Sequence, residues 1–258
     1  LAAQNGVNLK PLAQKEVRAL EPDIAGVAGL YSNTTGIIDS HNLMQAFVGD
    51  IENKGGMIVL NTKITHLISN DNGFVITTQD GYSVEANLLI NTAGHGAQTL
   101  SQSLLGDTHP SIPRQYFAKG HYYTISGSNH FKHLVYPVPV PGGLGTHATI
   151  DLAGQTRFGP DVQWLDSLNY SFDESREKEF KDSIRRYWPK IDDYTLQPSY
   201  TGIRPKTLPA DGGTQDFAIH MAGDHGMKNY ISLYGIESPG LTASMAIADY
   251  VVERYENA

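Results

Sequence analysis

Three segments carry side chains whose chemistry is versatile: Gly202-Ile-Arg-Pro205 with Arg204, Leu144-Gly-Thr-His-Ala-Thr149 with His147, and Lys119-Gly-His-Tyr-Tyr123 with Lys119. A planar guanidinium binds a carboxylate through two parallel charge-assisted hydrogen bonds. An imidazole exchanges a proton near neutral pH and can serve as a general base. Each residue type also has an ordinary structural role: an arginine in an ion pair, a histidine packed in a sheet, or a solvated lysine beside a glycine turn.

Several other chemistries find no support in the sequence. The chain has no cysteine, which excludes disulfides, thiol catalysis and cysteine-based metal sites. The pair His130-x-x-His133 lacks acidic partners at metal-ligand spacing, so no metal site is expected. The serine-hydrolase elbow and the P-loop pattern are also missing, and Ser238 is better interpreted as a helix cap than as a nucleophile.

The composition sets broad limits on the kind of protein. A length of 258 residues with 40% hydrophobic residues suits one large or two modest domains. The net charge of −8 argues against non-specific binding of nucleic acid. No apolar run approaches the ~20 residues that span a bilayer, so no integral membrane segment is expected and peripheral membrane association stays open. The cytoplasm is the default location.

The clearest structural pattern lies near the C-terminus, where residues 231–234 form an apolar β-rich run that ends at Gly235. Ser238 and Pro239 then supply the N-cap oxygen and the first residue expected of a helix. The apolar positions that follow predict one amphipathic face: Leu241, Met245, Ala248, Val252 and Tyr255. Such a strand–loop–helix directs free backbone N–H groups at the loop, which suits an anionic ligand, although an ordinary closing unit of an α/β domain has the same pattern.

The first half of the chain predicts alternating helices and strands. A helix begins at Asp39 or Ser40 and ends at Gly55-Gly56, with an apolar face made by Met44, Phe47, Val48 and Ile51. A short buried strand is expected at 57–60. Asp80-Gly81 predicts a hairpin turn within a set of strands at residues 64–69, 74–79 and 82–86.

A second strand–loop–helix follows at residues 87–105. Residues 87–91 predict a buried parallel strand, and the loop after it contains Gly94-x-Gly96. This resembles a dinucleotide fingerprint only in part, because Thr99 occupies the third glycine position and no acidic residue follows about 20 residues later. We interpret the loop as a secondary cofactor contact; a plain βα turn is the structural alternative.

Residues 111–205 change in character and predict an antiparallel sheet, with strands at 116–125, 133–136, 145–151, 155–158 and 198–205. Pro137, Pro139 and Pro141 indicate an edge strand or an extended loop, and residues 173–188 predict a helix that Pro189 ends. The order along the chain is therefore α/β, antiparallel, and α/β again. One domain interrupted by another explains this order most simply.

These segments together resemble the FAD-dependent D-amino-acid oxidase superfamily, and most closely its members of the L-2-hydroxyglutarate dehydrogenase or oxidase type. The resemblance covers nearly the whole chain and is strongest at residues 116–123, 135–159, 201–205 and 231–247. It implies an α/β fold with α+β character: an incomplete three-layer FAD/NAD(P)-binding domain (39–110 and 206–258) interleaved with a mixed, largely antiparallel substrate domain (1–38 and 111–205).

The resemblance also implies roles for individual residues. Arg204 would pair with the substrate carboxylate, His147 would take the hydroxyl proton, and Lys119 would meet a second carboxylate or the flavin. Tyr122 and Tyr136 would line the substrate site. FAD would be held non-covalently by two loops: Asn91, Ala93 and Gly94 in the first, and Gly235, Glu237, Ser238, Gly240, Leu241 and Thr242 in the second.

Members of this superfamily begin with a strand, a Gly-x-Gly-x-x-Gly loop and a helix, and no such element precedes residue 39 here. We therefore expect a C-terminal portion of a flavoenzyme, on the order of 100 residues short of the whole. The expected reaction is dehydrogenation of a small 2-hydroxy acid to the 2-oxo acid. Amine or amino-acid oxidation, glycerol 3-phosphate oxidation, and a flavin-free non-catalytic domain are the alternatives.

Overall fold

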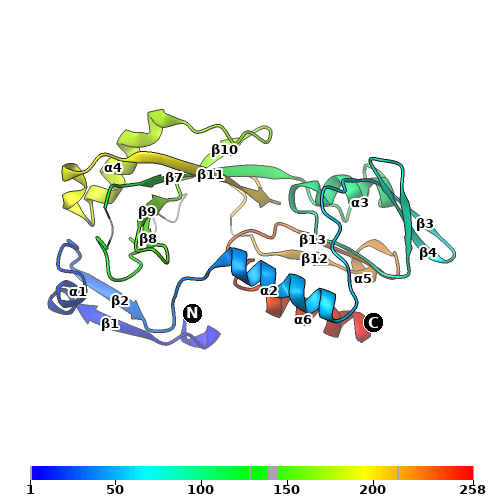
Figure 1. The fold of residues 1–258 in the computed structure, drawn as a ribbon, viewed down its shortest axis with the longest axis horizontal. Coiled ribbons are helices and arrows are strands. Elements are labelled where there is room, and N and C mark those ends of the chain that lie inside the picture. Colours follow the sequence, from blue (N-terminus) through cyan, green and yellow to red (C-terminus); the bar gives the residue numbers. More distant parts are fainter. Residues whose placement is uncertain (1, 128, 139–144, 214, 258) are drawn as a thin grey trace. The chain divides into compact units, whose positions relative to one another are not determined.

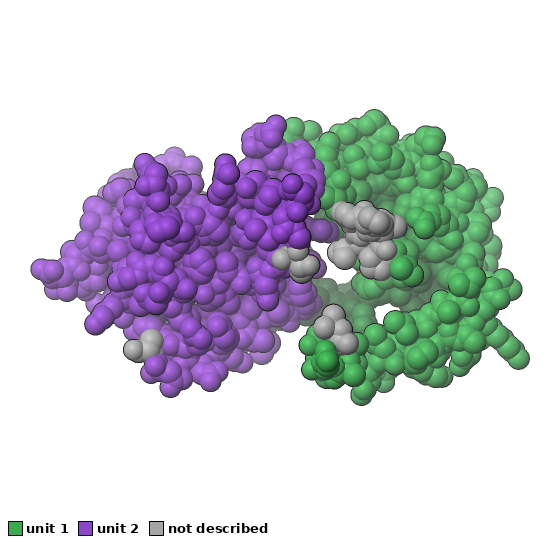
Figure 2. All heavy atoms as spheres, turned by 180° about the vertical axis from the view of Figure 1, so that it is seen from behind, with its two compact units in different colours: residues 1–43, 119–163, 169–203 green, residues 44–118, 164–168, 204–258 purple. Residues whose placement is uncertain are grey.

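The structure, a computed structural model, describes residues 2–127, 129–138, 145–213 and 215–257 (Figure 1). The chain forms two compact units, coloured separately in Figure 2. Unit 1 comprises residues 1–43, 119–163 and 169–203, and unit 2 comprises residues 44–118, 164–168 and 204–258. These divisions lie near the domain boundaries expected at 38, 111 and 205. Residues 164–168 belong to unit 2, whereas the sequence analysis placed them in the same domain as the rest of 111–205.

A five-stranded sheet lies mostly in unit 1, with the ends of some strands in unit 2. Its main path runs β10 (Gln163–Leu165), β7 (Tyr116–Thr124), β9 (Thr156–Gly159) and β8 (His147–Ile150), and β11 (Gln197–Lys206) pairs with β7. The β7–β9 and β8–β9 pairs are antiparallel, as the sequence predicts. Residues 133–136 were expected to form a strand but make only an isolated bridge from Val135 to Ala148. Pro139, Pro141 and Leu144 lie outside the described residues.

One face of this sheet forms the core of unit 1. Ala148 and Phe158 on the sheet pack with Phe180 and Ile184 of α4 (Glu177–Arg185) and with Trp188. The helix expected over 173–188 is shorter, because 3₁₀ turns flank α4 at Glu174–Arg176 and Pro189–Asp193. The remaining elements of unit 1 are a short 3₁₀ turn (Ala3–Asn5), α1 (Gln14–Leu20) and an antiparallel pair, β1 (Leu9–Ala13) with β2 (Ala28–Ser32).

Unit 2 contains two small sheets. In the first, β13 (Tyr230–Tyr234) lies between β12 (Ala218–His220), which is antiparallel to it, and β6 (Leu89–Asn91), which is parallel. The second is an antiparallel meander of β3 (Ile64–Asn70), β4 (Gly73–Thr78) and β5 (Ser83–Ala86). Asp80-Gly81 makes the predicted hairpin turn, with φ of 84° at Gly81. The glycine adopts the positive φ that such a turn requires, so the predicted position of the turn is confirmed.

Four helices and a 3₁₀ turn complete the elements described for unit 2. They are α2 (Ser40–Asn53, whose first residues belong to unit 1), the turn Gly94–Gly96, α3 (Ala97–Leu105), α5 (Ala222–His225) and α6 (Ser244–Glu256). Asp39 caps α2 as predicted, accepting the Asn42 N–H at 3.0 Å. No described helix is both long enough and apolar enough to cross a membrane.

Three sequence expectations for unit 2 are wrong. Residues 57–60 form no strand, and Met57 and Leu60 are 81% and 77% exposed. Among the described residues no strand pairs with them, so the ladder that would define a strand is missing. The expected apolar face of α2 is not buried either. The apolar face expected for α6 also faces solvent, while Ile247 and Val251 of α6 pack on β13 instead.

Candidate active site

One face of the unit 1 sheet gathers the polar residues singled out from the sequence. Thr149 lies opposite Arg157 across the β8–β9 pair, and His147 is two residues before Thr149. Side chains two residues apart on a strand share a face, so His147 and Arg157 lie on the same side of the sheet. Thr124 of β7 also lies opposite Arg157, which places Tyr122 on this side. We call this side, opposite the core, the polar face.

Aromatic rings order the polar face. The ring of Tyr136 lies 4.1 Å from that of His147, measured between centroids. Tyr122 and Tyr200 stack with centroids 4.5 Å apart and an interplanar angle of 12°. The guanidinium carbon of Arg157 lies 5.2 Å from the centre of the Tyr200 ring, which is cation–π geometry. The rings therefore hold the histidine and the arginine in place beside one another.

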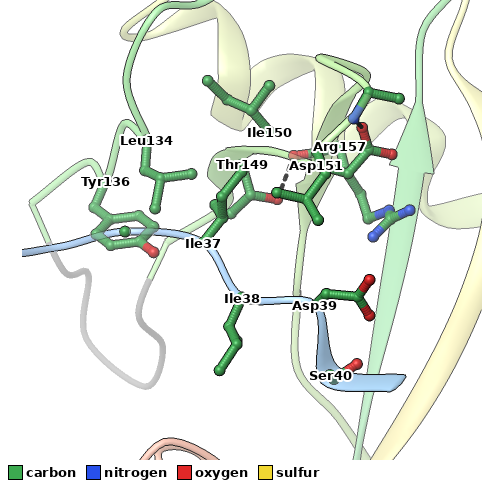
Figure 3. A pocket seen from close by; sticks show the side chains of 13 residues that line it. Ile37, Ile38, Asp39, Ser40, Leu134, Tyr136, Thr149, Ile150, Asp151 and Arg157 are labelled. Carbon is green, nitrogen blue, oxygen red and sulfur yellow. Dashed lines mark hydrogen bonds between the residues drawn. The ribbon is translucent and has the colours of Figure 1, made fainter. Parts of the chain in front are cut away.

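A cavity of about 540 Å³ opens beside these residues within unit 1. Figure 3 shows Tyr136 at one end of it and Arg157 at the other, with the segment around Ile37 and Ile38 running along it. Asp39 and Asp151 also line this cavity, but backbone N–H groups already bind both carboxylates: that of Asn42 in the first case, and those of Ala153 and Gln155 in the second. The volume is that of a small-molecule site.

Lys119 lies on the other side of the sheet. Lys119, His121 and Tyr123 alternate along β7, are buried, and share the core face with Phe158, the register partner of Tyr123. The Lys119 ammonium donates a hydrogen bond to the Ser171 carbonyl at 2.9 Å. The structure therefore brings His147, Tyr122 and Tyr136 together on or beside the polar face but places Lys119 opposite them. The solvated lysine considered as the structural alternative is wrong, because Lys119 is buried.

A second polar cluster lies under the same strand. His121 Nδ1 is 3.0 Å from an oxygen of Asp161, and this carboxylate also pairs with Arg176 at the start of α4. Burial, the largest cause, and nearby carboxylates raise the pKa of Tyr123 to about 12. The cluster ties the β9–β10 connection to the helix and is structural.

In unit 2, two loops leave the same edge of the sheet. β6 and β13 are parallel, with Ser232 opposite Asn91, so the loops at residues 92–96 and 235–243 both follow the carboxyl ends of adjacent strands. In open α/β sheets ligands bind at this edge. An apolar cavity of about 440 Å³ in unit 2 is lined by residues of both loops, including Gly94 and Gly240.

The loop after β13 differs from the sequence expectation. Residues 238–243 form successive turns and α6 begins only at Ser244, so Ser238 does not cap the helix; the N-cap is Ala243 and has no side-chain cap bond. In the part of the chain that the structure describes, the N–H groups of Leu241 and Thr242 have no intramolecular acceptor. Some of the predicted free N–H donors therefore belong to the turn that precedes α6.

Asn91 is buried at the end of β6 and fixes the first loop. Its amide nitrogen lies 2.9 Å from the Ala97 carbonyl, 3.2 Å from Ser101 Oγ and 3.1 Å from the Tyr230 hydroxyl. Its oxygen accepts the Ala93 N–H at 3.2 Å. These bonds join β6, α3 and β13 and use the hydrogen-bonding groups of the side chain. The geometry assigns Asn91 the role of shaping the loop.

Arg204 lies near Glu237 of the second loop. Its Nε is 3.8 Å from one Glu237 oxygen, whereas the other oxygen pairs closely with Lys206. The ion pair weighed as the structural role of Arg204 is thus present but long. Glu237 is neutralised mainly by Lys206, which leaves guanidinium donors of Arg204 for another acceptor.

Comparison with known proteins identifies the chain. The family profile described as "FAD dependent oxidoreductase" (DAO) matches residues 1–254. The chain belongs to the DAO family. This confirms the predicted family and the predicted fold class, and it confirms FAD as the cofactor on which the family depends.

Individual relatives refine this assignment. A mitochondrial L-2-hydroxyglutarate dehydrogenase of Arabidopsis thaliana is 35% identical over 99% of this chain, and the chain spans only 62% of its length. A glycerol 3-phosphate dehydrogenase of Caloramator mitchellensis is 28% identical over 98% of the chain and 52% of the relative. The FAD-bound L-α-glycerophosphate oxidase of Mycoplasma pneumoniae has the same fold, with a TM-score of 0.82 at 23% identity, covering 98% of this chain and 67% of the oxidase.

The two loops of unit 2 fit the cofactor of the DAO family. A side chain at Gly240 would place its Cβ 2.6 Å from the Glu237 carbonyl oxygen, so the backbone there is folded tightly on itself. The free N–H groups of Leu241 and Thr242 can bind an electron-rich edge, and the apolar cavity beside them can accommodate a flat ring. Within the described residues no group of three or more histidines and carboxylates forms a metal site.

Sequence reasoning missed two kinds of residue in this DAO-family chain. Arg157 and Tyr200 of the polar face lie in strands that the sequence predicts. The sequence does not reveal how these strands pair, so it could not show that the two side chains lie together. The network of Ser101 with Tyr230 and Tyr234, at 2.7 and 2.6 Å, was missed too. The sequence offers one weak indication of this network: Ser101 lies four residues after Ala97, on the helix that follows the glycine loop.

Proposed function

We propose that this protein dehydrogenates a small 2-hydroxy acid of the L-2-hydroxyglutarate class to the corresponding 2-oxo acid. The observation that carries the proposal is the 35% identity, over 99% of the chain, to an L-2-hydroxyglutarate dehydrogenase. The polar face of unit 1 supports it, because a histidine and an arginine stand side by side there with a cavity alongside. Oxidation of a 2-hydroxy acid requires a base for the hydroxyl proton, and a guanidinium binds a carboxylate of such a substrate.

In this proposal each residue of the chain has a defined task. FAD, when bound, would supply the oxidant that takes up the hydride of the substrate α-carbon. His147 takes the proton of the substrate hydroxyl, with its ring oriented by Tyr136. Arg204 binds the carboxylate next to the reacting carbon, using donors that the long contact to Glu237 leaves available. Tyr122 forms part of the substrate wall, and Lys119 supports the sheet from its core face.

The loops of unit 2 hold the flavin in this proposal. Asn91 sets the position of Ala93 and Gly94. The second loop, from Gly235 through Glu237, Ser238, Gly240, Leu241 and Thr242, would hold the flavin and offer N–H groups that suit negative charge on it. These 258 residues contain no cysteine that could form a thioether link to the flavin.

Glycerol 3-phosphate oxidation is the second candidate, favoured by the relative that is 28% identical over 98% of the chain. The deciding experiment mixes the FAD-loaded full-length protein anaerobically with L-2-hydroxyglutarate, glycerol 3-phosphate, glycine or sarcosine and records flavin bleaching. We expect the highest kcat/KM with the hydroxy acid. Faster bleaching by glycerol 3-phosphate or by an amine would refute the proposal, and a protein that binds no flavin would point to a non-catalytic role.

The role of His147 has its own test. In His147→Gln the rate of flavin reduction by L-2-hydroxyglutarate should fall by about 10²–10⁴-fold, the usual contribution of a general base. The rise of the wild-type rate with pH should also disappear. His66→Gln, at an exposed histidine of β3, is the matched control and should keep the wild-type profile. A His147→Gln enzyme with the wild-type rate and pH profile would remove His147 from the mechanism.

The cellular location stays a prediction. We propose a cytoplasmic protein and leave weak attachment to a membrane surface open. Fractionation of cells that produce the untagged full-length protein, with and without a high-salt wash, separates the two cases. Protein that sediments with membranes and is released by salt indicates peripheral binding.

A further inference from the structure

Arg157 is a cation whose anionic partner is missing from the part of the chain that the structure describes. Its Nε is buried and has no hydrogen-bond acceptor among the described residues, and no carboxylate of those residues lies within ion-pair distance of its guanidinium. Burying part of a charged group without a partner carries a desolvation cost that a protein normally offsets with an opposite charge. An anionic ligand would supply that charge.

The surroundings of Arg157 hold its guanidinium ready for such a ligand. Tyr200 lies under it at 5.2 Å and is itself fixed by the stack with Tyr122. The two carboxylates that share its cavity, Asp39 and Asp151, already accept backbone N–H groups within their own segments. Neither carboxylate lies within ion-pair distance of the guanidinium. A fixed guanidinium loses little further entropy when it binds a planar anion.

The distance from Arg157 to His147 suits a single small ligand. Across the antiparallel β8–β9 pair the two residues are diagonal neighbours on one face, a relation that brings their Cβ atoms to within roughly 7–8 Å of each other. The cavity of about 540 Å³ is lined by Arg157 and by Tyr136, whose ring contacts that of His147 (Figure 3). A ligand can therefore place its reacting carbon near the histidine and a second charged end at the arginine.

We propose that Arg157 binds the carboxylate of the substrate that lies far from the reacting carbon, and so selects dicarboxylic over monocarboxylic 2-hydroxy acids. This inference rests on the proposed function. Within unit 1, His147 and Arg157 then have separate tasks: accepting the proton and binding the far carboxylate. A site built around a charged hydrogen-bonding group discriminates strongly against an analogue that lacks the matching group.

The first experiment compares L-2-hydroxyglutarate with L-2-hydroxypentanoate, which has the same chain length but lacks the second carboxylate. It uses the FAD-loaded full-length protein as wild type, Arg157→Gln, Arg157→Lys and the control Arg18→Gln, which removes an exposed arginine of α1. The ratio of the two kcat/KM values should fall by about 100-fold in Arg157→Gln, since a partly desolvated charge pair contributes about two factors of ten to binding. Arg157→Lys should recover part of the ratio, and Arg18→Gln should keep the wild-type ratio.

A second experiment does not depend on turnover. Isothermal titration with glutarate, a dicarboxylate without a hydroxyl group, should show binding to wild type that weakens by a similar factor in Arg157→Gln and less in Arg157→Lys. Equal glutarate affinities in wild type and Arg157→Gln, or an unchanged substrate ratio, would overturn the inference. If neither hydroxy acid is oxidised but glutarate binding still depends on Arg157, the proposed function fails and the carboxylate site stands. If Arg157→Gln does not fold, the comparison of Arg157→Lys with wild type decides.

Discussion

Replacing Asn91 with alanine tests how the sheet of unit 2 fixes the first cofactor loop. The amide of Asn91 has two N–H donors, so two of its three contacts, to Ala97, Ser101 and Tyr230, act as full hydrogen bonds at one time. Its oxygen makes one more bond, to the Ala93 N–H. Three buried bonds at about 1 kcal/mol each, with a small cavity added, give a loss of roughly 3–4 kcal/mol in the free energy of unfolding.

Bonds among the neighbouring residues remain after the substitution and reduce the expected loss of stability. The Tyr230 hydroxyl and Ser101 Oγ remain bonded to each other at 2.7 Å, and Ser101 Oγ also bonds the Ala97 carbonyl at 2.9 Å. Neither hydroxyl is therefore orphaned by the substitution, and the expected loss lies at the lower end, about 3 kcal/mol. The freed Ala93 N–H also loosens the loop, so FAD should bind more weakly.

Urea unfolding of the flavin-free full-length protein, followed by far-UV circular dichroism, measures the first effect. With an m-value of about 2–3 kcal/mol per molar, the midpoint of Asn91→Ala should shift down by about 1–1.5 M. Asn87→Ala, at an exposed asparagine just before β6, is the control and should leave the midpoint in place. A shift in Asn91→Ala no larger than that control would show that the network does not support this loop.

Three further predictions concern the substrate, the cofactor loop and pH. Arg204→Lys should raise the KM for L-2-hydroxyglutarate by about 30-fold because an ammonium cannot form the two parallel bonds; an effect no larger than that of Arg114→Lys, at an exposed site of unit 2, would contradict its role. Gly240→Ala should weaken FAD binding and cost about 1–3 kcal/mol of stability, since the new Cβ would lie 2.6 Å from the Glu237 carbonyl oxygen; fluorescence titration with FAD and urea unfolding check this, and wild-type values in both would refute the tight fit. Burial lowers the pKa of His225, so the unfolded chain binds this proton more readily; stability is full above the ordinary histidine pKa and is lost as pH falls toward the lowered value. Urea midpoints between pH 5 and 7.5 should therefore depend less on pH in His225→Gln, and an equal dependence in both proteins would contradict this.

Local patterns let the sequence predict much of the secondary structure. Gly81 adopts the positive φ that a hairpin turn requires, and Asp39 caps α2 through its own side chain. The strand at 87–91 was expected to be parallel and buried, and β6 does pair in parallel with β13, although it lies at the end of that sheet's described order. Such features depend on neighbours within a few residues, so the chain order alone reveals them.

Patterns that need a distant partner were predicted less well. The apolar run at 57–60 looked like a buried strand, but a strand exists only where another strand pairs with it. In α6 two apolar stripes lie side by side, and periodicity cannot tell which of them packs; Ile247 and Val251 do. No local pattern indicated that α6 begins only at Ser244. Ser238 and Pro239 have the residue types of a helix N-cap and first helical residue, so the sequence predicted an earlier start.

By itself the sequence determined the family and the residue types available for chemistry, because short motifs such as Gly202-Ile-Arg-Pro205 and the loop before α6 are read along the chain. Only the tertiary structure decided which of these residues share a surface. The register of β8 and β9 puts His147 and Arg157 on one face, and the alternation along β7 turns Lys119 to the other. Because a side chain in a sheet changes face with every residue, this outcome depends on pairing between strands far apart in sequence.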